Sequence, residues 1–289
     1  MSNQKQHNTV TVSDTLSQAH IRMTDISDSA ALDAQVLLAH VLEVPRSWLL
    51  AHGEEPLTNE QVAKFGSLLV RVVGGEPLPY VLGEWEFYGL PFIVNPAVLI
   101  PRPETELLVQ TAIDWLRVHP NRRQAVDVGC GSGCIGIVIA KYFTDTTITA
   151  IDISYEALAI AAQNAARHDV QTCIEFLQND LLNGVNKKFD LLCANLPYIP
   201  TSTLHDLDIY QREPTLALNG GPDGLELIRR LLKQAPLHIA PGGLLLLEIE
   251  SDQGDRAACL AAEAFPQANI YVRSDLARKP RLLVIEVPG

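Results

Sequence analysis

Several features that would assign this sequence to a special class are scarce or missing. It has only five cysteines, an odd number without a Cys-x-x-Cys pair, which argues against a disulfide framework and a thiolate metal site. No apolar run approaches the about 18 residues that a membrane helix needs, and the start of the chain contains no apolar signal core. We therefore expect a cytoplasmic protein with reduced thiols, without a metal ion and without a membrane partner.

Basic residues are also scarce. Lys and Arg number 22 against 34 Asp and Glu, which gives a formal charge of −12. A protein of this charge is not attracted over long distances to nucleic-acid phosphates or to anionic membranes. We therefore expect no direct nucleic-acid partner. A hydrophobic content of 47% excludes a disordered chain.

A length of 289 residues predicts about two domains, and the hydrophobic pattern changes near residue 90. Apolar residues recur at helical spacing from Ser29 to about Gly75, and we therefore predict a helical domain over residues 1–79. Aromatic and β-branched residues around Gly89 and Pro91 then predict a β-hairpin, in a linker spanning residues 80–103. Residues 104–289 form the predicted second domain.

Helical and strand patterns alternate from residue 104 to the end of the chain. Seven short apolar segments separated by helical patterns are typical of strands buried on both faces of a parallel sheet. They are QAVDVG, ITAID, CIEFLQ, FDLLCAN, GLLLLEIE, ANIYVR and RLLVIEV. The last two are joined by only seven residues, too few for a crossover helix, and are expected to be antiparallel. The sequence predicts an α/β, Rossmann-like, seven-stranded sheet.

The first predicted strand runs into a glycine-rich loop ahead of a helix. Such a loop lets the backbone approach a ligand closely, and the free N–H groups of the helix start can bind it. Asp152 ends the second strand, where its carboxylate can accept hydrogen bonds from ribose hydroxyls. The candidate cofactor-binding residues of the loop are Gly129, Cys130, Gly131, Ser132 and Gly133.

The loop pattern D-x-G-x-G-x-G resembles that of S-adenosyl-L-methionine (AdoMet) methyltransferases. Gly131, Gly133 and Gly136 also satisfy the GxGxxG of dinucleotide enzymes, so NAD and a purely structural turn stay open. Asp180, after the third strand, is a candidate acceptor for the adenine amino group, with Leu181 covering the ring. The alternative is that Asn179 and Asp180 only form a turn, and the sequence supports this interpretation equally well.

The fourth strand ends in Asn195, Leu196, Pro197 and Tyr198. An amide or aromatic amino group is a poor nucleophile because its lone pair is delocalised. The Asn195 side-chain oxygen and the Leu196 carbonyl can accept its two hydrogens and aim the nitrogen at a sulfonium methyl, while Tyr198 packs on the planar group. Asn195 and Tyr198 are therefore the candidate catalytic residues. The alternative is that these four residues only begin a loop, in which Asn195 caps the backbone and Tyr198 fills space in the core.

The sequence resembles the HemK/PrmC family of protein-(glutamine-N5) methyltransferases, which modify peptide chain release factors. The resemblance covers nearly all of the chain after the first two dozen residues. Besides the glycine loop, it rests on the strings RxxxGEPLxY from Arg71, GEWEFYGL from Gly83, LIPRPETE from Leu99, NLPYIP from Asn195 and EPTLALNGGPDGL from Glu213.

This resemblance implies AdoMet as the cofactor, bound by Gly129 to Gly133, Asp152, the Asp180–Leu181 region and Asn195, with S-adenosyl-L-homocysteine as the product. It implies that Asn195 to Tyr198 contact the glutamine of a release factor's Gly-Gly-Gln motif. The family usually has Asn-Pro-Pro-Tyr, but Leu196 still supplies the required backbone carbonyl. Leu181 stands where relatives often have an aromatic residue.

Three other functions stay open. They are adenine-N6 methylation of nucleic acid, methylation of a glutamine in a ribosomal protein, and a non-catalytic AdoMet-sensing or release-factor-binding module. The helical domain over residues 1–79 is expected to recognise the substrate.

Overall fold

The computed structural model describes residues 10–289. These residues divide into two compact units, one ending at Gly83 and the other running from Glu84 to Gly289. Helix α5 (Leu78–Leu82) belongs to the first unit, so helical structure continues to within one residue of the division. None of the helices in residues 10–289 is long and apolar enough to cross a membrane.

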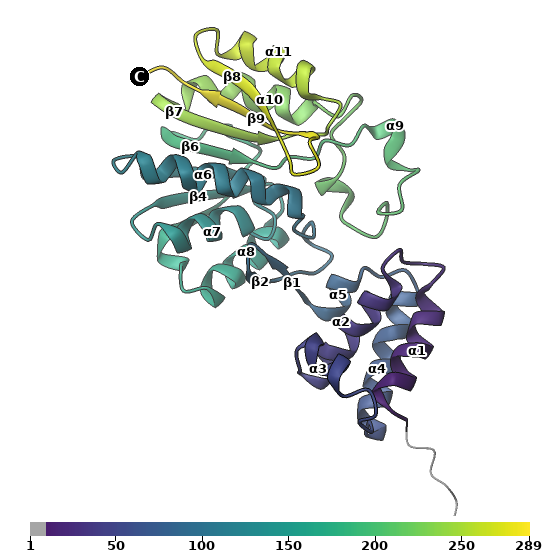
Figure 1. Ribbon diagram of the computed structural model, residues 1–289. Coiled ribbons are helices and arrows are strands. Elements are labelled where there is room, and N and C mark those ends of the chain that lie inside the picture. The colour runs from purple at the N-terminus through teal and green to yellow at the C-terminus, as the bar shows by residue number, and fades with distance from the viewer. Residues whose placement is uncertain (1–9) are drawn as a thin grey trace, which may run out of the picture. The chain divides into compact units, whose positions relative to one another are not determined.

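The first unit is helical, and α1, α2 and α4 pack against one another (Figure 1). Its elements before α5 are α1 (Val12–Met23), α2 (Ala30–Leu42), α3 (Arg46–Ala51) and α4 (Asn59–Val73). Both α1 and α4 begin with a capping box, in which a threonine and the residue three positions on satisfy each other's backbone N–H. The apolar faces of the helices form one core around Leu37, Leu38 and Phe65.

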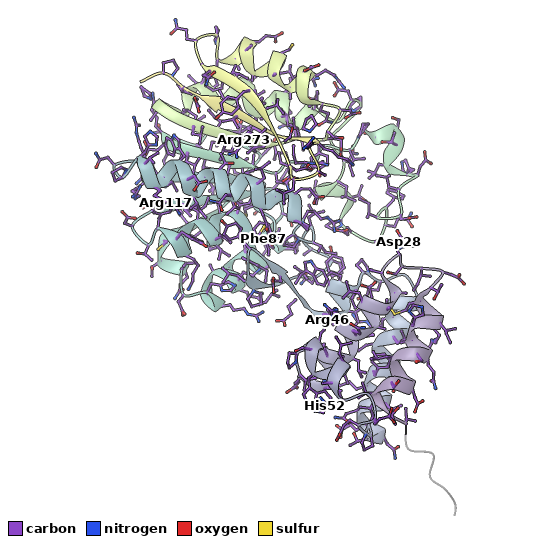
Figure 2. The ribbon with its side chains drawn as sticks, viewed as in Figure 1. Asp28, Arg46, His52, Phe87, Arg117 and Arg273 are labelled. Carbon is purple, nitrogen blue, oxygen red and sulfur yellow. The ribbon has the colours of Figure 1, made fainter. Side chains whose placement is uncertain are left out.

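The second unit starts with the predicted β-hairpin. Strands β1 (Glu84–Phe87) and β2 (Leu90–Ile93) pair antiparallel, and the two turn residues, Tyr88 and Gly89, both have positive φ, as a tight two-residue hairpin requires. Phe87, labelled in Figure 2, is buried and packs edge-on against Phe92. The hairpin is thereby fixed to the main core of this unit.

A seven-stranded sheet forms the centre of the second unit, as the sequence predicts. Its order is β5-β4-β3-β6-β7-β9-β8; the first five are parallel, and β9 is antiparallel to both β7 and β8. The strands are β3 (Gln124–Val128), β4 (Thr147–Asp152), β5 (Ile174–Gln178), β6 (Phe189–Ala194), β7 (Ile239–Glu248), β8 (Asn269–Ser274) and β9 (Pro280–Glu286).

Helices cover both faces of this sheet (Figure 1). One core lies under α6 (Glu106–Val118), α7 (Cys134–Tyr142) and α8 (Tyr155–Arg167), and the other under α10 (Glu226–Gln234) and α11 (Gly254–Ala264). The short α9 (Thr201–Leu204) and the 3-10 turns η1 (Pro103–Thr105), η2 (Gln171–Cys173), η3 (Thr215–Ala217) and η4 (Ala235–Leu237) complete the unit.

The order of the strands determines where a site can form. The chain leaves β3 toward β4 on one side and later returns to β6 on the other, so the sheet reverses its winding beside β3. In open α/β sheets, ligands bind outside the carboxyl ends of the strands at such a switch point. The segments after β3, β4, β6 and β7 therefore meet at one edge.

Candidate active site

A pocket of about 720 Å³ opens at this edge of the sheet. Its walls include the ends of β3 and β4, the segment that follows β6, the segment around Arg102, and the turn η3. Of the predicted site residues, it is lined by Gly129, Cys130, Gly131, Ser132, Asp152, Asp180, Leu181, Asn195, Leu196 and Pro197. Gly133 and Tyr198 do not line it.

The glycine loop is folded by positive φ angles at Gly129, Gly131 and Gly133, which favour glycine. A Cβ on Gly131 would meet nothing within 4 Å, so the loop backbone there is open to a ligand. A Cβ on Gly133 would instead lie 3.0 Å from Ile137 and 3.1 Å from Ala161. Gly133 therefore serves the close packing of the loop against helices rather than the pocket wall.

Asp152 holds the loop as well as lining the pocket. Its Oδ2 accepts a hydrogen bond from the Gly131 N–H and its Oδ1 from the Ser154 N–H, both at 2.9 Å. Burial raises the pKa of this carboxyl, and the backbone N–H groups oppose that rise. Each oxygen keeps a second lone pair, so the carboxylate can still accept hydrogen bonds from a ligand.

The Asp180–Leu181 segment forms a turn, and the Asp180 carboxylate is bound by an arginine side chain. Asp180 Oδ2 accepts from Arg230 Nη2 at 2.5 Å, a pairing that the sequence did not reveal. Leu181 has φ 52° and its carbonyl accepts from the Asn179 side chain, which stabilises this unusual backbone. The buried Leu181 side chain supplies an apolar wall.

Asn195 stands directly after β6 with its amide nitrogen engaged. Its Nδ2 donates to Thr105 Oγ1 at 3.0 Å, so its Oδ1 is the polar atom left for the pocket that Asn195 lines. Leu196, where the family usually has proline, is buried, and a Cβ on Gly129 would lie 2.9 Å from its Cδ2. The leucine thus locks the Asn195 loop against the glycine loop by packing instead of by ring stiffness.

Tyr198 turns away from the pocket toward the end of β7. Its hydroxyl donates to Glu248 Oε1 at 3.4 Å, and its carbonyl accepts from Gln253 Nε2 at 2.9 Å. Burial raises the pKa of the phenol far above its ordinary range, with nearby Glu248 adding to the effect. The phenol stays neutral and cannot act as a base near neutral pH.

Residues from two distant segments support Asn195 and Tyr198, and their contacts could not be predicted from the sequence. Glu213 forms an ion pair with Arg102 and accepts from the Ile100 N–H at 3.1 Å, which anchors the segment leading to Thr105. A Cβ on Gly220 would lie 2.7 Å from Tyr198 Cα. These residues belong to the LIPRPETE and EPTLALNGGPDGL strings, which therefore both support the Asn195 loop and contribute residues to the pocket wall.

Alanine at Gly224 should damage this backing. Gly224 has φ +76°, and a Cβ there would overlap the Tyr198 carbonyl oxygen and the Gln253 side chain. We expect Gly224→Ala to lower the thermal midpoint of unfolding by several degrees, because the backbone must shift to relieve the overlap. Gly184→Ala is the matched control, because Gly184 has φ +70° but open space around it and should lose only about 1–2 kcal/mol. Equal effects of the two substitutions would contradict the packing argument.

Asp127, at the base of the glycine loop, is a buried carboxylate whose pKa is raised to about 7, chiefly by desolvation. Its Oδ2 accepts from the Gly136 N–H at 3.0 Å, whereas Oδ1 has no hydrogen-bond partner within residues 10–289. Ionisation of this group is therefore costly in the folded protein.

Folding stability should consequently fall as pH rises toward 7. Between its ordinary pKa of 3.8 and about 7, Asp127 is protonated in the folded state and ionised in the unfolded state, so deprotonation opposes folding. The Asp127→Asn substitution introduces a neutral isostere of the protonated acid. We expect urea denaturation from pH 5 to 8 to show that this substitution removes up to about 1.4 kcal/mol per pH unit of the slope. Parallel wild-type and variant curves would count against the raised pKa.

Comparisons with known proteins agree with this architecture. Residues 14–83 match the PrmC N-terminal domain family, and residues 103–212 match the methyltransferase small domain family. A methyltransferase crystal structure from Pyrococcus furiosus superposes with a TM-score of 0.53 at 16% identity, covering 78% of this chain and 100% of that chain. Fold and matched domain together define an AdoMet-dependent methyltransferase.

The sequence relatives narrow this class. The chain is 38% identical to the release factor glutamine methyltransferase of Koribacter versatilis, over 93% of this chain and 95% of the relative. It is 41% identical to that of Moorella thermoacetica, over 86% and 89% of the two chains. The chain belongs to the PrmC family of release factor glutamine methyltransferases, as the sequence resemblance predicts. Among residues 10–289, no group of three or more His, Cys, Asp or Glu side chains could hold a metal ion.

Proposed function

We propose that this protein transfers a methyl group from AdoMet to the side-chain amide N5 of a glutamine in the Gly-Gly-Gln motif of a peptide chain release factor. The observation that carries the proposal is the amide of Asn195, whose nitrogen is engaged by Thr105 and whose oxygen is left for the pocket beside the glycine loop. The names of the relatives at 38% and 41% identity support the same substrate.

The pocket fits AdoMet in size and in chemistry. Its volume of about 720 Å³ lies within the usual range for cofactor sites. The spare lone pairs of Asp152 suit ribose hydroxyls, and the open backbone of Gly131 suits close approach of the cofactor. Leu181 and Leu227 supply apolar surface for a flat ring, beside the Asp180 carboxylate. When bound, AdoMet supplies an electrophilic methyl group.

The chain's own residues solve the problem of the unreactive amide nitrogen. In the proposal, Asn195 Oδ1 and the Leu196 carbonyl accept the two N–H hydrogens of the substrate amide, which orients the nitrogen and stabilises the positive charge that develops on it. Pro197 restricts the loop, and packing of Tyr198 on the planar group requires its ring to move from the position in which its hydroxyl donates to Glu248. Because the raised pKa of Tyr198 excludes a phenolate base, the methylated amide loses its proton to water.

The remaining assignments follow from this function. We assign substrate recognition to the helical unit, whose match to the PrmC N-terminal domain supports it. We assign cofactor binding to the loop from Gly129 to Gly133, of which Gly129 to Ser132 line the pocket. The cytoplasm, where release factors meet ribosomes, is the proposed location.

Mass spectrometry of a purified release factor after incubation with the protein and isotopically labelled AdoMet tests the proposal. We expect one added methyl group on the glutamine of Gly-Gly-Gln, and none on a release factor in which alanine replaces that glutamine. Parallel reactions contain a total ribosomal protein fraction and ribosomal RNA. Label in either of these with an unmodified release factor would overturn the proposed substrate.

A further inference from the structure

One face of helix α8 runs from the cofactor pocket to the β-hairpin, and Asn164 lies on this face. Ala157, at its start, lines the pocket, and Ala161, one turn later, packs closely against Gly133 of the glycine loop. Asn164 follows on the next turn, where its side chain is completely buried. Toward its C-terminal end, α8 lies against β2 (Figure 1). A polar side chain buried at this place needs hydrogen-bond partners.

The amide of Asn164 bonds the backbone of two different segments. Its Oδ1 accepts from the Ile93 N–H at 2.7 Å, and its Nδ2 donates to the Ile93 carbonyl at 3.0 Å. The same nitrogen also donates to the Ser132 carbonyl at 3.0 Å. Both hydrogens of the amide are therefore used. Because backbone N–H and C=O groups cannot exchange their roles as donor and acceptor, these partners fix the orientation of the amide.

Both of the bonded segments lead to walls of the cofactor pocket. Ser132 lines the pocket itself, as part of the glycine loop. Ile93 ends β2 and is followed by a turn, in which the Asn95 Oδ1 accepts from the Ala97 N–H at 2.9 Å and the Asn95 carbonyl accepts from the Val98 N–H at 3.1 Å. Ala97 and Val98 also line the pocket. Since the turn is closed by two hydrogen bonds, the position of Ile93 determines the position of this second wall.

We infer, on the basis of the proposed function in which AdoMet occupies this pocket, that Asn164 is a positioning residue for the cofactor. It holds the glycine loop and the wall at Ala97 and Val98 in a fixed relation, so that both can contact AdoMet at once. A ligand that binds both walls then also stabilises the segment joined to them. AdoMet should therefore stabilise the hairpin, although residues 84–93 lie outside the pocket lining.

Two substitutions of Asn164 test this role by calorimetry with AdoMet. Asn164→Asp keeps the shape and the acceptor for the Ile93 N–H, but it removes both donors and places carboxylate oxygens beside two carbonyl groups. Asn164→Ala removes all three hydrogen bonds. We expect each substitution to raise the dissociation constant of AdoMet about tenfold or more, because the two walls are no longer joined.

The hairpin should stay attached to α8 in these variants. His168, directly after α8, donates from Nε2 to the Pro91 carbonyl at 2.9 Å, and this bond does not involve the glycine loop. The matched control for lost stability is Leu116→Ala, which opens a cavity at a fully buried position in α6 outside the pocket lining. Gln163→Ala is the exposed neighbour on α8. Both controls should bind AdoMet with wild-type affinity.

Hydrogen exchange gives a readout that a loss of stability does not imitate. In the wild-type protein, saturating AdoMet should slow the exchange of backbone amides in the hairpin, residues 84–93, as well as in the glycine loop. In Asn164→Ala and Asn164→Asp, saturating AdoMet should still slow exchange in the glycine loop but no longer in the hairpin. Leu116→Ala should keep the wild-type pattern.

The role of Asn164 would be refuted if AdoMet failed to protect the hairpin of the wild-type protein, or if it protected the hairpin equally in Asn164→Ala. Wild-type affinity in both Asn164 variants would refute it as well. No release factor takes part in these measurements. A release factor that stays unmodified would therefore overturn the proposed substrate and leave the role of Asn164 standing, whereas a hairpin that AdoMet does not protect would leave the methylation of release factor untouched.

Discussion

Replacing Asn195 with alanine is expected to lower the rate of methyl transfer about 10³-fold, the upper end of what a lost transition-state hydrogen bond costs. Alanine removes the acceptor that aims the amide nitrogen and stabilises its developing charge. It leaves Asp152 and the glycine loop untouched, so AdoMet affinity should fall only moderately. Single-turnover kinetics with labelled AdoMet and a purified release factor measure the rate, and calorimetry measures the affinity.

Two further variants sharpen this experiment. Asn195→Asp keeps an acceptor but loses the donor to Thr105, so it should retain more activity than alanine if the acceptor is the essential group. Asn183→Ala, an exposed change outside the pocket lining, should behave as wild type. Wild-type turnover in Asn195→Ala would remove Asn195 from the catalytic role.

The sheet could be predicted because each of its strands is a short apolar run between helical patterns. The hairpin could be predicted from the turn residue Gly89.

Helix α1 could not be predicted from the sequence. Its buried face consists of Val12, Thr15, Ala19 and Met23, a helical stripe too polar and small to stand out from the surrounding sequence. The signal that could have indicated it is Thr11 followed by Asp14, which forms the capping box.

Most of the predicted site residues line the pocket, for a topological reason. Residues that directly follow parallel strands collect at one sheet edge, and Asp152 and Asn195 are such residues. The sequence places a residue within its own element, but it does not place that element against a distant one. Thr105 lies 90 positions from Asn195, and Glu248 meets Tyr198 only because β7 pairs with β6. Arg230 on Asp180 was missed for the same reason.

Gly133 and Tyr198 illustrate a second limit. Both belong to motifs whose other residues line the pocket. Gly133 nevertheless packs against Ala161, and the Tyr198 hydroxyl donates to Glu248. A motif predicts the neighbourhood of a residue, whereas the direction of its side chain depends on the local backbone. The proposed ring contact of Tyr198 with substrate therefore remains a prediction, which kinetics of Tyr198→Phe and Tyr198→Ala can examine.

Replacing Asp152 with alanine is expected to weaken AdoMet binding about 100-fold, which corresponds to about 2.7 kcal/mol. Two effects add up in this estimate. Hydrogen bonds from ribose hydroxyls to a charged acceptor are lost, each worth about 1.5–3 kcal/mol. The loop also loses the anchors at Gly131 and Ser154, so its open backbone is no longer held in place for the cofactor.

The division between affinity and rate distinguishes this role from that of Asn195. At saturating AdoMet, Asp152→Ala should retain a turnover number within about tenfold of wild type, because Asp152 does not contact the transferred methyl or the amide nitrogen in the proposed arrangement. Asp145→Ala is the control. It removes an exposed acid just before the opposite end of β4, where Asp145 pairs with Arg123, and it should leave the affinity for AdoMet unchanged. Calorimetry that finds equal AdoMet affinity for wild type and Asp152→Ala would refute the ribose assignment, and Asp152 would then be an anchor of the loop alone.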